Sequence, residues 1–246
     1  MSDQQKSCLV EKLSAFVDLD DVDSSLLARL EKDNKSYKKQ TEIWTINDEI
    51  QNLHVVQKGW LISYTVLQDG RRQVLEIHYP GDVIGMSDIP FRHSTSNLIA
   101  LEDCVLCPFP KSEVDVIFAE SPRLTALLFT LAMIDKAVNL DRLRVLGRMS
   151  ARERLAHILL EIHSRLTLTR GVLEDGFRFP LSQFDLADAL GLTNVSVSNA
   201  FGKLEKEQLI SRDVGNIKLL EVNSMIAMSD YINRYREVDI SWFPNI

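Results

Sequence analysis

The 246-residue sequence has no uninterrupted apolar run near the roughly 18 residues that a membrane-spanning helix needs. It begins with the polar stretch Met-Ser-Asp-Gln-Gln-Lys, which is unlike a signal peptide. It also lacks internal repeats, low-complexity tracts and linkers rich in proline or glycine. We therefore expect a cytoplasmic globular protein of one or two domains with no membrane partner.

Cysteine is scarce, with only Cys8, Cys104 and Cys107. An odd number of thiols in a reducing compartment argues against a disulfide framework. Cys104 and Cys107 are three positions apart, which puts them on opposite faces of a strand, so we expect strand-core thiols and not half of a metal or redox site. His78 could ligate haem, but a lone histidine on a half-buried strand is usually a hydrogen-bonded core residue. No metal site is predicted.

Catalytic motifs are absent as well. The sequence has no Gly-x-Ser-x-Gly elbow, no His-Glu-x-x-His and no Gly-x-x-x-x-Gly-Lys loop, so we expect no enzyme. The formal net charge of -7 excludes a histone-like DNA coat, which would be strongly basic throughout. The segment from Arg142 to Arg170 is nevertheless rich in arginine, which allows a local cationic face.

The first half of the sequence changes from a helical to a β pattern. Apolar residues at helical spacing predict short helices between residues 9 and 35. Short strand-like stretches separated by glycine-containing turns follow, at residues 53–57, 60–67, 74–79 and 104–109. Closely spaced short strands are typical of a barrel-like or jelly-roll-like β-roll. We assign residues 1–120 to this N-terminal sensor domain.

A long helix is predicted over residues 121–147. Pro122 suits its first turn, and apolar side chains recur about every 3.5 residues, at Leu124, Leu128, Leu131 and Val138. So narrow a stripe is typical of a two-helix seam, and we expect these side chains to form the interface of a parallel homodimer. Arg142 interrupts the same stripe, and a neighbouring stripe with Leu127 and Ile134 is expected to share the contact.

Residues 148–246 are assigned to a third part, a winged helix-turn-helix whose signature lies between residues 182 and 209. Ser182 is expected to cap its first helix and Thr193 its second, with Gly191 as the left-handed residue of the turn. Both Ser182 and Thr193 are also expected to contact the DNA. The second helix is expected to enter a major groove with an outward face made of Asn194, Val195, Ser196, Asn199 and Lys203. Asn199 could pair with an adenine.

Further cations flank this motif. A hairpin with its turn at Gly215–Asn216 carries Arg212 and Lys218, which we expect to lie on phosphates. A capping box at Ser150 starts another helix, whose arginines either form a solvated face or contact phosphate, and Arg152 is the candidate. The expected partner is a double-stranded DNA operator. The alternative is a winged helix that binds protein, which the acidic net charge permits.

These elements, in this order, resemble the Crp/Fnr family of bacterial regulators. The similarity covers roughly residues 40–222. It is carried by Pro80-Gly-Asp-Val-Ile-Gly, by residues 146–156 and by the helix-turn-helix. The resemblance implies an α+β transcription regulator with a cyclic-nucleotide-binding-type roll, a dimerisation helix and an inverted-repeat operator. RNA polymerase is a further expected partner if the chain is an activator.

The residues with which family members bind cyclic AMP are not present in this sequence. Members that bind cyclic AMP have a glutamate after the glycine that matches Gly85, and an arginine paired with serine or threonine for the phosphate. This sequence has Met86 in the first place, and Ser94, Thr95 and Ser96 where the pair belongs. We therefore expect the pocket at Gly85, Met86 and residues 94–96 not to take cyclic AMP.

Two further departures from the family concern the cofactor and the operator. Iron-sulfur members use four cysteines, most of them near the N-terminus, where this sequence has only Cys8. No cofactor is therefore identified, and the effector is unknown. In the recognition helix, Asn194, Val195 and Asn199 replace the arginine, glutamate and second arginine of the cyclic AMP-responsive members, so the operator must differ.

Overall fold

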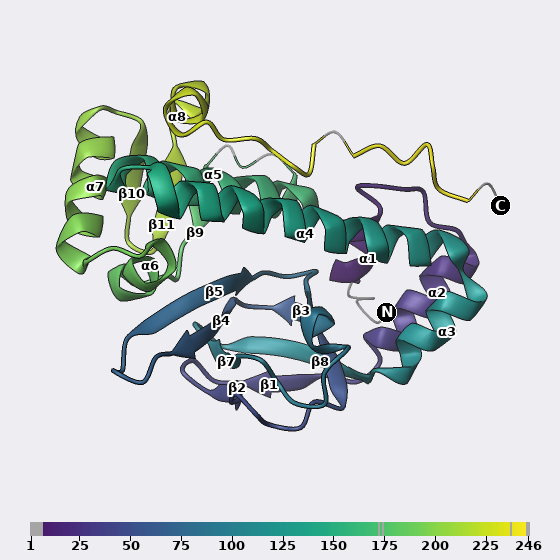
Figure 1. Ribbon diagram of the computed structural model, residues 1–246. Coiled ribbons are helices and arrows are strands. Elements are labelled where there is room, and N and C mark those ends of the chain that lie inside the picture. Colours follow the sequence, from purple (N-terminus) through teal and green to yellow (C-terminus); the bar gives the residue numbers. More distant parts are fainter. Residues whose placement is uncertain (1–6, 172, 174, 237, 245–246) are drawn as a thin grey trace. The chain divides into compact units, whose positions relative to one another are not determined.

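The computed structural model describes residues 7–171, 173, 175–236 and 238–244. The chain divides into two compact units. Unit 1 comprises residues 1–65, 75–133 and 239–246, and unit 2 comprises residues 66–74 and 134–238. The boundary falls inside the long helix α4 (Pro122–Arg148), which is drawn in teal in Figure 1. No described helix is both long enough and apolar enough to cross a membrane.

The centre of unit 1 is a β-roll of two four-stranded sheets, ordered β1-β8-β3-β6 and β2-β7-β4-β5. Strand β3 pairs antiparallel with both β8 and β6. The strands are β1 (Lys35–Tyr37), β2 (Glu42–Trp44), β3 (Asn52–Lys58), β4 (Leu61–Val66), β5 (Arg72–His78), β6 (Val83–Ile84), β7 (Asn97–Ala100) and β8 (Cys104–Pro110). The four predicted strands are confirmed as β3, β4, β5 and β8.

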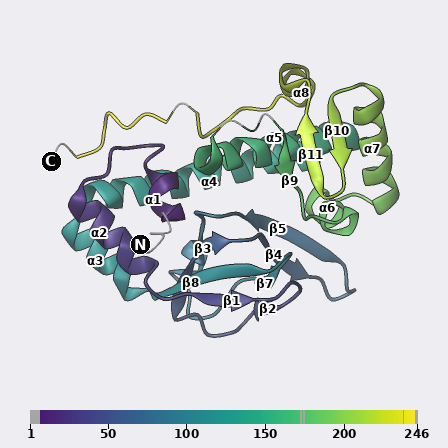
Figure 2. The same ribbon diagram turned by 180° about the vertical axis from the view of Figure 1, so that it is seen from behind.

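Three helices pack against the roll within unit 1: α1 (Cys8–Leu13), α2 (Asp21–Leu30) and α3 (Ser112–Glu120). Figure 2 shows α2 and α3 side by side at one end of the roll. Apolar side chains of these helices share one core with β3 and β8, and Leu124 at the start of α4 belongs to that core. Buried Asp23 joins α2 to the start of α4, because it accepts hydrogen bonds from Ser121 Oγ (2.6 Å) and Arg123 Nε (2.9 Å).

The C-terminal segment departs from the predicted domain boundaries. Residues 239–246 belong to unit 1 and not to the winged-helix domain. Phe243 and Ile240 pack against the core of unit 1, and the Trp242 ring lies 6.2 Å from that of Phe129 on α4. Apolar side chains at the very end of the chain thus complete the N-terminal domain.

The cysteines and His78 have the structural roles predicted for them. Cys107 and Cys104 are both buried on strand β8 and lie in two different core clusters of unit 1. Burial raises the pKa of the Cys104 thiol to about 11. His78 Nε2 lies 2.7 Å from Ser63 Oγ in a buried hydrogen bond. The Cys8 side chain lies outside the described part of the structure.

Unit 2 holds four helices beyond α4 and a three-stranded sheet ordered β10-β11-β9. Its elements are α5 (Ala151–Arg170), β9 (Phe177–Arg178), α6 (Gln183–Leu190), α7 (Asn194–Lys206), β10 (Ile210–Asp213), β11 (Asn216–Leu219) and α8 (Val222–Ser229). Asp213 pairs with Asn216, so the hairpin turn is Val214–Gly215. The predicted turn was therefore wrong by one residue, and Gly215 supplies its positive φ of 71°.

Candidate nucleic-acid interface

The pair α6 and α7 is built from the predicted local signals. Ser182 caps α6, with its Oγ accepting from the amide of Asp185 at 3.1 Å. Gly191 ends α6 in the left-handed conformation, at φ 60° and ψ 42°. Thr193 then caps α7, with its Oγ1 accepting from the amide of Ser196 at 3.2 Å. Ser182 and Thr193 thus fix the helix ends, which is the structural role predicted for them.

Helix α7 has a clear inner and outer face. Val197, Ala200, Phe201 and Leu204 are buried, whereas Val195, Asn199 and Lys203 are exposed, as predicted. Asn194 is only half-exposed, and its carboxamide oxygen is buried without a hydrogen-bond partner among the described atoms. Asn194 therefore offers less outward surface than the sequence suggested.

A groove between the start of α5 and the outer face of α7 gathers most of the remaining candidates. Its volume is about 740 Å³, and its lining side chains include Ser150, Arg152, Ser196, Asn199, Lys203, Lys206 and Glu207. Arg152 forms an exposed ion pair with Glu207 at 2.5 Å. Three cations against one carboxylate make this groove attractive to phosphate, and the N-terminus of the capped helix α5 adds to the attraction. Sequence reasoning missed Lys206, although its spacing from Asn199 places it on the outer face of α7.

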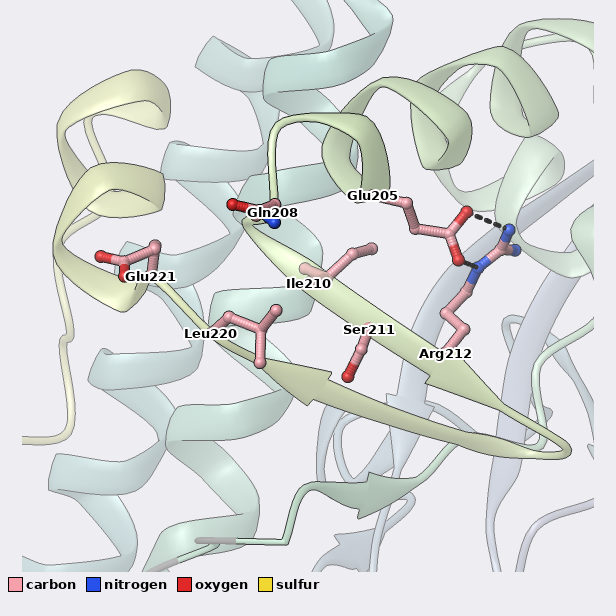
Figure 3. A pocket seen from close by; sticks show the side chains of 7 residues that line it. All are labelled: Glu205, Gln208, Ile210, Ser211, Arg212, Leu220 and Glu221. Atoms are coloured by element: carbon pink, nitrogen blue, oxygen red, sulfur yellow. Dashed lines mark hydrogen bonds and ion pairs between the residues drawn. The ribbon is translucent and has the colours of Figure 1, made fainter.

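The two predicted wing cations have different environments. Lys218 is exposed on β11, opposite Ser211. Arg212 is turned toward α7, where it donates to Glu205 at 2.9 and 2.7 Å (Figure 3). Its guanidinium also lies 4.2 Å above the Phe201 ring. Hydrogen bonding to Arg212 holds the pKa of Glu205 below its usual value. Arg212 therefore links the wing to the recognition helix, and its contact with phosphate stays a prediction.

The predicted effector pocket lies in unit 1 and contains an acidic residue of the chain itself. Gly85 has a φ of 94° and leads into a short 3-10 helix, Met86–Asp88. Asp88 is only 2 % exposed. Its carboxylate accepts hydrogen bonds from the Thr95 amide (3.1 Å) and hydroxyl (2.7 Å). The amide and hydroxyl of Thr95 are thus bound to Asp88 and are not available to an anionic ligand.

The Ser94 hydroxyl and the Ser96 amide of this pocket are also engaged. The Ser94 hydroxyl donates to the Ser96 carbonyl at 2.5 Å and accepts from the Ser96 amide at 3.3 Å. Arg92 is exposed, and its guanidinium lies 3.9 Å from Glu49. A cyclic nucleotide phosphate placed here would meet the Asp88 carboxylate without an arginine to offset the repulsion. The residues present do not fit that ligand.

The predicted interface residues of α4 are largely covered within the single chain. Leu124 is 1 % exposed within the single chain, Val138 is buried, and Leu128 and Leu131 are partly buried against the core of unit 1. Side chains already covered in one protomer have little surface to offer a second. The exposed apolar residues of α4 form another stripe: Phe129, Met133, Leu140 and Leu143.

Two family models match the two units. The cyclic nucleotide-binding domain matches residues 34–121, and the Crp-like helix-turn-helix domain matches residues 153–228. The nitrogen fixation regulation protein FixK of Bradyrhizobium diazoefficiens is 34% identical over 179 residues, which cover 73% of this chain and 74% of FixK. The chain belongs to the Crp/Fnr family of transcription regulators.

Other Crp/Fnr proteins support this assignment. The fumarate and nitrate reduction regulatory protein of Escherichia coli is 25% identical over 206 residues, 84% of this chain and 82% of the relative. The structure of FixK2 from Bradyrhizobium japonicum matches with a TM-score of 0.71 and 26% identity, over 80% of this chain and 96% of FixK2. The predicted fold class, with a roll, a long helix and a helix-turn-helix, is confirmed, and so is the expectation that the chain is no enzyme.

Proposed function

We propose that this Crp/Fnr regulator binds an inverted-repeat DNA operator as a homodimer and reads its sequence with α7. The groove lined by Arg152, Asn199, Lys203 and Lys206 carries the proposal, because it sets cations beside an exposed polar recognition face. Phosphate contacts hold such a protein in register, and side chains on the recognition helix distinguish the bases. The acidic net charge of the whole chain does not oppose this, since the cations act locally.

The homodimer would form through the exposed stripe of α4. Phe129, Met133, Leu140 and Leu143, together with exposed Lys136, follow one another at alternating spacings of four and three residues. That spacing is typical of the seam of a coiled coil, and a single lysine in a seam selects the register. Two-fold symmetry would then place the two recognition helices about 34 Å apart, one turn of DNA.

Selection of duplexes from a random pool with the purified full-length protein tests the operator. We expect enrichment of an inverted repeat whose half-site centres are separated by about 10 base pairs, with an affinity that falls steeply as salt is raised. Enrichment of single half-sites, or binding that does not depend on salt, would contradict the proposal.

Two alanine substitutions separate base reading from phosphate contact. Asn199→Ala should change base preference at one position of each half-site, because a bidentate base contact gives about 1–3 kcal/mol of discrimination. Lys218→Ala should weaken binding to all duplexes alike and reduce the salt slope by about one unit. Fluorescence anisotropy over a set of single-base operator variants measures both effects. If both substitutions scale all affinities equally, the assignment of the reading face fails.

The proposal for the sensor roll is that it does not use a cyclic nucleotide. Asp88 and its hydrogen bonds with Thr95 support this, together with the absence of an arginine at residues 94–96. Calorimetric titration with cyclic AMP and cyclic GMP should give no saturable heat. A dissociation constant below about 10 μM, worth about 7 kcal/mol, would require a charge partner for the phosphate and would overturn the proposal.

A further inference from the structure

One exposed apolar side chain lies at the start of the otherwise polar reading face of α7. Val195 is 69 % exposed, in the first turn of the helix directly after the Thr193 cap. Asn199 lies one turn further along the same face, and the cations Lys203 and Lys206 follow. Single exposed apolar residues are common on protein surfaces, so exposure alone does not assign a role. The position of Val195 does, because the first turn of a recognition helix is the part that reaches the base edges.

The isopropyl group of Val195 can neither donate nor accept a hydrogen bond. Over guanine, adenine or cytosine it would remove water from polar groove atoms and give them no partner. Thymine is the one base that presents an apolar group in the major groove, its C5-methyl. Contact with that methyl buries both apolar surfaces and leaves no hydrogen-bonding group unpaired.

We propose that Val195 reads a thymine through its C5-methyl group in each half-site of the operator. The inference rests on the proposed function and adds to it the chemistry of one base contact. Asn199, four residues on, lies about 6 Å further along the helix axis. The adenine that Asn199 is expected to pair with should therefore lie within about two base pairs of this thymine, since base pairs are stacked about 3.4 Å apart.

The test removes only the methyl group from the DNA. Starting from the duplex selected above, each thymine is replaced in turn by deoxyuridine, symmetrically in both half-sites, and binding of the full-length protein is measured at fixed salt. For the wild type we expect one position where deoxyuridine weakens binding by about threefold to tenfold per half-site, the effect of uncovering one methyl group. For Val195→Ala the same replacement should change affinity by less than about twofold, because the alanine methyl does not reach the base.

Val22→Ala is the matched control, because Val22 is also exposed and lies on α2 in unit 1. It should keep the wild-type response to deoxyuridine. Alanine favours a helix more than valine does, so Val195→Ala should retain the wild-type melting temperature or exceed it. Wild-type binding that is unaffected by deoxyuridine at every position overturns the inference, as does a full response retained in Val195→Ala. Both results leave the proposed function intact, whereas a failure to select any duplex overturns both.

Discussion

Arg142→Ala is expected to lower the free energy of unfolding of unit 2 by about 3–5 kcal/mol, because it would remove the hydrogen-bonded charge partner of a buried carboxylate. Glu161 on α5 is 2 % exposed. Arg142 on α4 donates to its two carboxylate oxygens, from Nε at 3.1 Å and from Nη2 at 2.5 Å. Burial by itself would raise the pKa of Glu161, but the charge and hydrogen bonds of Arg142, together with the charges of Arg165 and His157, hold that pKa below its usual value.

Two optical probes locate this loss of stability. Trp44, Trp60 and Trp242 all lie in unit 1, so tryptophan fluorescence reports on that unit, whereas far-ultraviolet circular dichroism follows the helices of both. In urea, the main shift should appear in the dichroism transition.

Arg148→Ala, at an exposed arginine on the same helix, should change stability by no more than about 0.5 kcal/mol. A double variant, Arg142→Met with Glu161→Leu, should recover most of the loss. Equal stability of Arg142→Ala and Arg148→Ala would show that the ion pair contributes nothing.

Much of unit 2 could be predicted because its signals are local. Ser150, Ser182 and Thr193 each cap a helix within three residues of their own position, and Gly191 adopts the conformation that its turn requires. Such features need no knowledge of the rest of the fold. The small strands β6 and β9 escaped prediction, since two residues are too few to show alternation.

The errors concern side chains whose partners are distant in sequence. Arg142 interrupts the predicted seam because it faces Glu161, 19 residues away. Asp88 belongs to no sequence motif, and it meets Thr95 only in the folded chain. Helix α4 has apolar residues on two faces, and spacing alone does not tell which face its own protomer covers.

Two glutamates in the exposed stripe of α4, Leu140→Glu with Leu143→Glu, should convert the proposed dimer to a monomer. Each leucine buried in a seam contributes about 1.5–3 kcal/mol, and two-fold symmetry counts each substitution twice. The glutamates add like charges that face each other across the seam. The dimer dissociation constant should therefore rise more than about 100-fold, which is about 2.7 kcal/mol and well below the summed loss. Sedimentation velocity at micromolar concentration measures it.

The affinity for the operator should fall when the dimer dissociates. A monomer contacts one half-site with one recognition helix and lacks the second protomer that would hold it on the DNA. The outer face of α7 is untouched, so single half-sites should bind this variant and the wild type with similar weak affinity. Val22→Glu introduces the same charge at an exposed apolar position on α2 and should remain dimeric. A Leu140→Glu, Leu143→Glu variant that stays dimeric would exclude this stripe as the interface. Because Leu124 and Val138 are buried in the single chain, glutamate there should instead unfold the protomer.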